Sequence, residues 1–162
     1  MKTLKRRRKE NKTDYLIRVK LLKSNCPRIV FRKTNKYVIG QYIESKEARD
    51  KIVLGVTSKE LLKFGWPKEK GASLKSLPAS YLLGFLLGNK IKEKKLEIPI
   101  VDLGMLRTNH KTNPQGFIKG LIDAGLEIKA KKEAFPSEDR IKGDHLKNKI
   151  AFEKIKSEIS KK

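Results

Sequence analysis

Cysteine, acidic residues and long apolar runs are all scarce in this sequence of 162 residues. The single cysteine, Cys26, excludes an intramolecular disulfide and a CxxC metal knuckle within these residues. The longest apolar run is far shorter than the roughly 18 residues that a membrane-spanning helix needs. The basic segment 1–9 is not followed by the apolar stretch of a secretory signal. We therefore expect a soluble protein of a reducing compartment, without a membrane partner.

Lysine and arginine, by contrast, are abundant. Forty of them against eighteen acids give a net charge of +22, and 38% of the residues are hydrophobic, enough for one core. The excess is densest in residues 1–40, which hold fourteen cations and two acids, and it includes the run Lys5–Lys9, which we expect to be a solvated arm. That run alone fits a nucleic acid, a membrane surface or a nuclear address. Because the excess continues into the next segments, it favours nucleic acid.

Hydrophobic periodicity predicts one mixed sheet with helices on its faces. We expect a first helix capped by Thr13 or Asp14, with Tyr15, Val19 and Leu22 on one face. The expected strands are Arg28–Lys33, Lys36–Ile43, Lys51–Val56 (apolar, as if covered on both faces) and Ile98–Leu103, and Thr34-Asn35 is the expected hairpin turn. The later helices are expected at Leu77–Lys95 (stripe Tyr81, Leu82, Phe85, Leu86), from Asn113-Pro114 to Gly125, and from Pro136-Ser137 onward. We divide the chain into a basic RNA-binding arm and helix (1–25), an α/β core (26–130) and a C-terminal helical extension (131–162).

The predicted hairpin carries the most specific binding pattern. Strand alternation places Arg28 and Arg32 on the face opposite Ile29 and Phe31, where we expect them to be available to a ligand. Cations hold phosphates, and amides and phenols can read the 2′-hydroxyls of RNA. The candidate ribbon consists of Arg28, Arg32, Lys33, Asn35, Lys36, Tyr37 and Gln41. Tyr37 can either stack on a base or pack in the core.

No residue pattern predicts catalysis, a metal or a cofactor. Cys26 has no partner histidine, and His110 and His145 lack ligand spacing. Asp102 ends an apolar strand, where a two-metal nuclease would hold a carboxylate, but the first strand supplies cations rather than further acids. We interpret Asp102 as a structural hydrogen-bond acceptor for the turn that follows it.

Several motifs, in order, resemble a known family over residues 5–146. They are Lys12-Thr13-Asp14-Tyr15 with Arg18 and Leu22, Pro27-Arg28-Ile29-Val30, Arg32 to Gln41, Pro78 to Gly84, Val101-Asp102-Leu103-Gly104, Lys119-Gly120, Asp123 to Leu126, and Phe135 to His145. Together they resemble the 5S-rRNA-binding protein family of the large ribosomal subunit, universal protein eighteen in its archaeal form, related to eukaryotic ribosomal protein five.

The resemblance implies a three-layer α/β domain of ribonuclease-H-like topology without nuclease activity, in the cytoplasmic ribosome. It implies that the chain binds 5S rRNA, helps attach it to the large-subunit rRNA in the central protuberance, and meets neighbouring large-subunit proteins, with no small-molecule substrate. Besides the hairpin, the RNA-binding residues expected are Lys5, Arg6, Arg7, Arg8, Lys9, Lys12, Tyr15, Arg18, Arg107, Lys111 and Lys119. The chain departs from the family at Leu106, where a histidine is usual, and at Pro114-Gln115, where an arginine is common.

Two other functions remain alternatives at this point: a divergent metal-dependent nuclease, and a general nucleic-acid-binding protein or chaperone.

Residues 147–162 match no motif of the family. Their isoleucines, Ile150, Ile155 and Ile159, have helical spacing. We expect there a helix that lies on RNA or on a neighbouring protein.

Overall fold

The structure, a computed structural model, describes residues 3–67, 73–107, 109–146 and 150–161. Its helices are α1 (Arg6–Lys9), α2 (Tyr15–Lys23), α3 (Leu77–Glu93), α4 (Asn113–Asp123), α5 (Glu138–Lys142) and α6 (Phe152–Ser160), with 3-10 helices η1 (Ser58–Phe64) and η2 (Lys132–Ala134). The strands are β1 (Arg28–Lys33), β2 (Val38–Lys46), β3 (Arg49–Thr57) and β4 (Ile100–Asp102). None of the helices in the described ranges is long and apolar enough to cross a membrane.

The four strands form one mixed sheet in the order β3-β2-β1-β4. The pairs β1–β2 and β2–β3 are antiparallel, whereas β4 runs parallel to β1. The turn between β1 and β2 is closed by Thr34, whose amide and hydroxyl both donate to the carbonyl of Tyr37, at 2.9 and 2.6 Å. The predicted mixed α/β class, the hairpin and its turn are confirmed.

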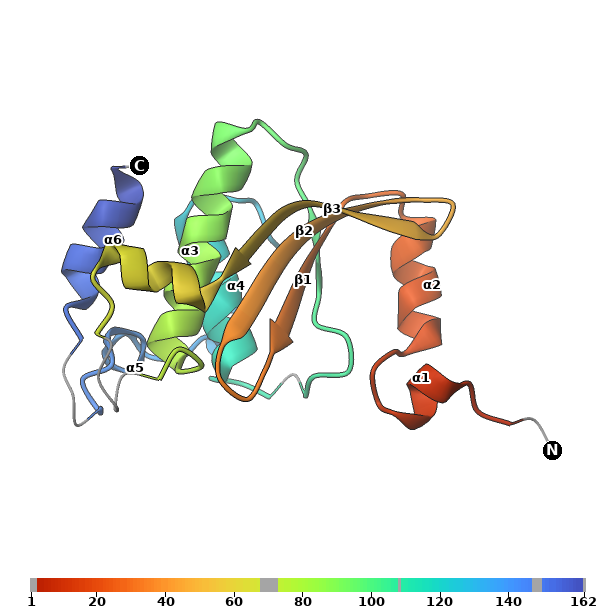
Figure 1. The fold of residues 1–162 in the computed structure, drawn as a ribbon, viewed down its shortest axis with the longest axis horizontal. Helices are drawn as coiled ribbons and strands as arrows, with labels where there is room; N and C mark the ends of the chain where they lie inside the picture. Colours follow the sequence, from red (N-terminus) through yellow and green to blue (C-terminus); the bar gives the residue numbers. More distant parts are fainter. Residues whose placement is uncertain (1–2, 68–72, 108, 147–149, 162) are drawn as a thin grey trace.

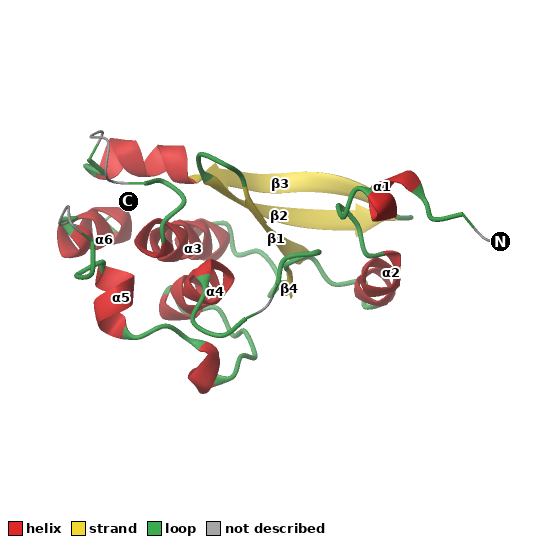
Figure 2. Ribbon diagram, turned by 90° about the horizontal axis from the view of Figure 1, so that it is seen from below, coloured by secondary structure: helices red, strands yellow, loops and turns green. Residues whose placement is uncertain are grey.

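The core lies between one face of this sheet and α3 with α4, while α1 and α2 lie at the other side of the sheet (Figures 1 and 2). Helix α3 begins after Ser76, whose hydroxyl accepts the amide of Ala79, and its predicted apolar stripe is buried. A Cβ atom at Gly84 would collide with the carbonyl oxygen of Phe117, so the glycine permits the close approach of α3 and α4. Gly125, with φ at +93°, ends α4 as predicted.

Two expectations about packing are wrong, and the structure limits a third to one side of a helix. Strand β3 is an edge strand, with Ile52 54% exposed, and it is not covered on both faces. Val19, predicted to lie on the packed face of α2, is 49% exposed, because Arg18 on another side of the helix bonds to the sheet. The isoleucine spacing near the C-terminus does predict a helix, α6, but Ile155 and Ile159 are buried in this chain's own core, next to α3. The helix therefore does not keep that face for RNA or for another protein.

Candidate nucleic-acid interface

Six of the predicted RNA-binding residues meet between α1–α2 and the outer face of the sheet. Arg7, Lys12, Arg18, Arg28, Arg32 and Gln41 line one cavity of about 220 Å³ there. Helix α2 begins at Asp14, whose carboxylate accepts the amides of Leu16 and Ile17. These backbone bonds, that of Ile17 foremost, and the charge of Arg8 outweigh burial and lower the pKa of Asp14. Of the two caps that the sequence left open, the structure therefore has Asp14.

Arg28 lines this cavity and is 1% exposed. Its guanidinium lies 2.8 Å from Asp50 Oδ1 and 3.2 Å from Asp102 Oδ2, and it donates to the hydroxyl of Ser45 at 2.9 Å. Within the described chain its Nε is buried without a hydrogen-bond partner. The expectation that Arg28 is available to a ligand is wrong. Strand alternation does place it opposite Ile29 and Phe31, but the side chains between α2 and the sheet cover that face.

Two aspartates hold the arginines together. Asp50 accepts from Arg28 and, at 2.9 Å, from Arg18 of α2, which also donates to the carbonyl of Ala48. Asp102 pairs with Arg28 and, at a longer 3.9 Å, with Arg32. We call this set, Arg18, Arg28, Arg32, Asp50 and Asp102, the arginine–aspartate layer. It fastens α2 to the sheet, because none of the nine residues of α2, all of them described, is itself buried.

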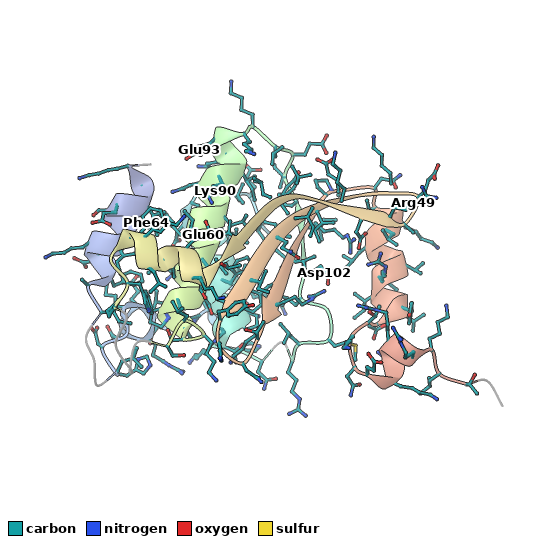
Figure 3. The ribbon with its side chains drawn as sticks, in the orientation of Figure 1. Arg49, Glu60, Phe64, Lys90, Glu93 and Asp102 are labelled. Carbon is teal, nitrogen blue, oxygen red and sulfur yellow. The ribbon has the colours of Figure 1, made fainter. Side chains whose placement is uncertain are left out.

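Burial and charge act in opposite directions on this layer. For Asp50, desolvation raises the pKa, but hydrogen bonds from Arg18 and Ser45 and the charge of Arg28 together lower it below its ordinary value. Desolvation lowers the pKa of Arg32, and Arg28 and Arg7 add to this effect, while Asp102 opposes it. Asp102 also accepts the amide of Gly104 through Oδ1 at 2.8 Å. Its predicted structural role is therefore confirmed, and Figure 3 shows it between the sheet and α2.

The N-terminal arm is partly engaged within the chain itself. Lys5 lies 4.7 Å from the ring centre of Tyr15, Arg7 donates to Thr13, and Arg8 contacts both Asp14 and the sulfur of Met105. Arg6 and Lys12 both pair with Glu10. Helix α1, all four residues of which are described, buries no side chain. The cations Arg6, Arg7, Lys9 and Lys12 remain exposed.

A second group of predicted residues lies at the turn end of the hairpin. Lys33, Asn35 and Lys36 are exposed there, and half-buried Tyr37 has the ammonium of Lys59 4.6 Å from its ring centre. Lys33, Arg107 and Lys111 line a groove of about 530 Å³ at this end. Lys119 does not join either group. It lines a smaller cavity with Asp123 and Lys156, beside the hydrogen bond from Tyr81 to Asp123.

Sequence reasoning missed some residues of both regions. Asp50 lies in the first positions of β3, just before the apolar run that predicts the strand, and an acid beside a basic hairpin is a usable signal. Arg140 and His145 line the groove and lie within the motif Phe135 to His145, yet they had no assigned role. Both residues are far from β1 in the sequence, and only the fold brings them to the same groove.

Fold and surface define a strongly basic α/β protein that has an ion-paired face on one side of its sheet and exposed cations at the turn end of the hairpin. Residues 1–101 match the family described as ribosomal large subunit proteins 60S L5 and 50S L18. The chain belongs to this family of ribosomal proteins.

Archaeal relatives extend the similarity past residue 101. The chain is 41% identical over 141 residues to the large ribosomal subunit protein uL18 of Korarchaeum cryptofilum, covering 87% of this chain and 70% of that protein. It is 38% identical over 141 residues to uL18 of Methanoregula boonei, covering 87% and 79%. It is 39% identical over 142 residues to uL18 of Caldivirga maquilingensis, covering 87% and 67%. The family resemblance, a ribosomal role in the cytoplasm and the absence of an enzymatic role are confirmed by these matches, since the family consists of structural ribosomal proteins.

Proposed function

We propose that the chain binds 5S rRNA and helps attach it to the large-subunit rRNA in the central protuberance, beside neighbouring large-subunit proteins. The observation that carries this proposal is the concentration of exposed cations around the hairpin turn and the N-terminal arm, in a chain of the L5/L18 family. Because these cations have no ion pair with a buried carboxylate of the described chain, they can contact phosphates without breaking such a pair. The order β3-β2-β1-β4, with β4 parallel to β1, also supports a ribonuclease-H-like topology for the sheet.

Binding at matched salt tests this function. We expect wild-type protein to bind folded 5S rRNA more tightly than an unrelated folded RNA of equal length or a DNA duplex of equal charge. Each phosphate that the protein neutralises should contribute roughly 0.7–0.9 to the slope of log affinity against log salt concentration. Equal affinity for all three probes would indicate a general nucleic-acid-binding protein instead. Co-sedimentation of the tagged chain with 5S rRNA in a gradient gives an independent reading of the same preference.

A further inference from the structure

The groove at the turn end of the hairpin differs in chemistry from the rest of the surface. Segments far apart in the sequence form it: the end of β1, the start of α3, the loop after β4, the start of α4, and α5 with the residues that follow (Figure 1, bottom). Its described lining is Phe31, Lys33, Ser76, Leu77, Leu106, Arg107, Lys111, Thr112, Asn113, Pro114, Arg140, His145 and Leu146. None of these described residues is acidic.

The groove has an apolar floor and a cationic rim. Leu77 and Pro114 are buried at its floor, and Leu106 and Leu146 are half-buried. The rim residues, which are Lys33, Arg107, Lys111, Arg140 and His145, are all exposed. Among the residues that the structure describes, no side chain of this rim has an ion-pair partner. A rim of unpaired cations favours an anion, while the floor favours an uncharged, flat or apolar group.

A nucleotide combines these two properties, because its base is uncharged and flat and its phosphate is anionic. Ligand pockets typically measure roughly 300–1,000 Å³ and place a few polar groups around an apolar lining, and this groove, at about 530 Å³, lies in that range. In a paired RNA helix the faces of the bases are stacked on one another and out of reach, whereas unpaired strands can splay a base outward. Arginine guanidinium groups can stack on such a base or hold its phosphate.

We propose that this groove binds one unstacked nucleotide of an unpaired RNA strand, with the base on the apolar floor and the flanking phosphates on Arg107, Arg140 and Lys33. The inference rests on the proposed RNA-binding function and adds to it a site with a preference for unpaired strands. The groove is next to the arm, because Met105, which contacts Arg8, directly precedes Leu106 of the floor. A strand that leaves a helix bound by the arm therefore reaches the groove within the same complex.

Paired and unpaired oligonucleotides separate this proposal from general phosphate binding. The probes are a mixed-sequence RNA heptamer and an RNA duplex of the same length, titrated with the wild-type full chain and with Arg107→Ala/Arg140→Ala. The double variant should bind the heptamer at least about tenfold more weakly and flatten its log–log salt slope by about 1.4, or roughly 0.7 for each phosphate that is no longer neutralised. Its affinity for the duplex should change much less. Arg49→Ala is the matched control, an exposed arginine at the far end of β3 that has no ion pair with another described residue (Figure 3).

A loss of equal size on heptamer and duplex would overturn the groove proposal, as would a loss no larger than that of Arg49→Ala. Photocrosslinking of a heptamer that carries 4-thiouridine is a second reading and needs no variant. Crosslinks should fall on the peptides around Leu106–Pro114 or Arg140–Leu146, and crosslinks confined to α1 and α2 would contradict the proposal. Failure of the proposed 5S function would instead appear with wild-type protein alone, as equal affinity for 5S rRNA and unrelated RNA.

Discussion

Two regions of this molecule are rich in cationic side chains, but the cations are placed differently in the two regions. In the arginine–aspartate layer, each arginine contacts a carboxylate, and Arg28 is 1% exposed. In the groove, four exposed cations and His145 surround an apolar floor with no acid in the described lining. A buried cation paired with acids holds structural elements together, whereas an unpaired, exposed cation retains its attraction for a polyanion. The number of cations in a segment therefore does not by itself locate a binding site. What matters is whether acidic side chains nearby in the fold already pair with those cations.

The largest effect is expected at Arg28. Arg28→Ala should lower the free energy of unfolding by about 3–5 kcal/mol, because it leaves buried Asp102 and partly solvated Asp50 without their shared partner. Denaturant titration measures this change. Arg49→Ala, the exposed control, should change stability by less than about 0.5 kcal/mol. A stable Arg28→Ala variant with weakened RNA binding would show that Arg28 belongs with the binding residues and would break the comparison.

Removal of residues 1–9 should weaken RNA binding without unfolding the domain. The segment carries six cations, and helix α1 within it buries no side chain. The log–log salt dependence of 5S rRNA binding should flatten by roughly 0.7–0.9 for each phosphate that the arm neutralises. Filter binding over a salt series measures the slope, and circular dichroism checks the fold. An unchanged slope would mean that the arm does not contact phosphates of the RNA. A large fall in melting temperature would mean that the contacts of the arm with Thr13, Asp14 and Met105 stabilise the domain.

Acid should weaken the arginine–aspartate layer. Because the folded-state pKa of Asp50 lies below its unfolded value of about 3.9, Asp50 contributes stability above that pH and loses it as the pH falls through the folded-state pKa. Asp50→Asn should therefore lower stability at pH 7 by about 1 kcal/mol or less, because the Asp50 side chain is 30% exposed and Asp102 still pairs with the buried Arg28. The wild type and Asp50→Asn should converge in stability as the pH falls from about 4 through the folded-state pKa of Asp50. A difference that stays constant with pH would assign the effect to packing.

The smallest effect is expected at Arg18. Its pair with Asp50, at 2.9 Å, joins α2 to the sheet, but both side chains are about 30% exposed. Arg18→Ala should therefore cost about 1 kcal/mol at most in global stability. Amide exchange in α2 should rise more clearly than exchange in β1, because α2 has few other attachments to the sheet. Uniform exchange changes across the chain would contradict this local role.

Much of the fold follows from local sequence signals. The hairpin with Thr34-Asn35, the Ser76-capped helix α3 and the end of α4 at Gly125 all depend on residues within a few positions of one another. The packing of α2 and β3 could not be predicted in the same way. Val19 has helical spacing with Tyr15, yet the side of α2 that faces the sheet is set by Arg18 reaching Asp50, 32 residues further along the chain. An edge position for β3 depends on which strand pairs with β1, and β4 takes that place.

The candidate site was predictable in part. Charge density points to the arm and the hairpin, but it does not distinguish Arg28 from Lys33 on the same strand. Only the fold shows that one meets two aspartates while the other lies at an open groove. Arg140 and Lys33 line the same groove because of the tertiary structure alone, so no spacing in the sequence predicts that they lie near each other. The RNA contacts themselves remain predictions for Lys33, Lys36 and the other residues named above.

Lysine footprinting tests most directly the central claim that unpaired, exposed cations bind the RNA. Wild-type chain is acetylated with and without a saturating amount of 5S rRNA, and the modified sites are quantified by mass spectrometry. Lys33, Lys36 and Lys111 should be protected by the RNA, whereas Lys90, paired with Glu60 at 3.0 Å on the α3 side of the molecule (Figure 3), should react equally in both samples. Unchanged reactivity of Lys33 and Lys111, together with protection of Lys90, would contradict the account.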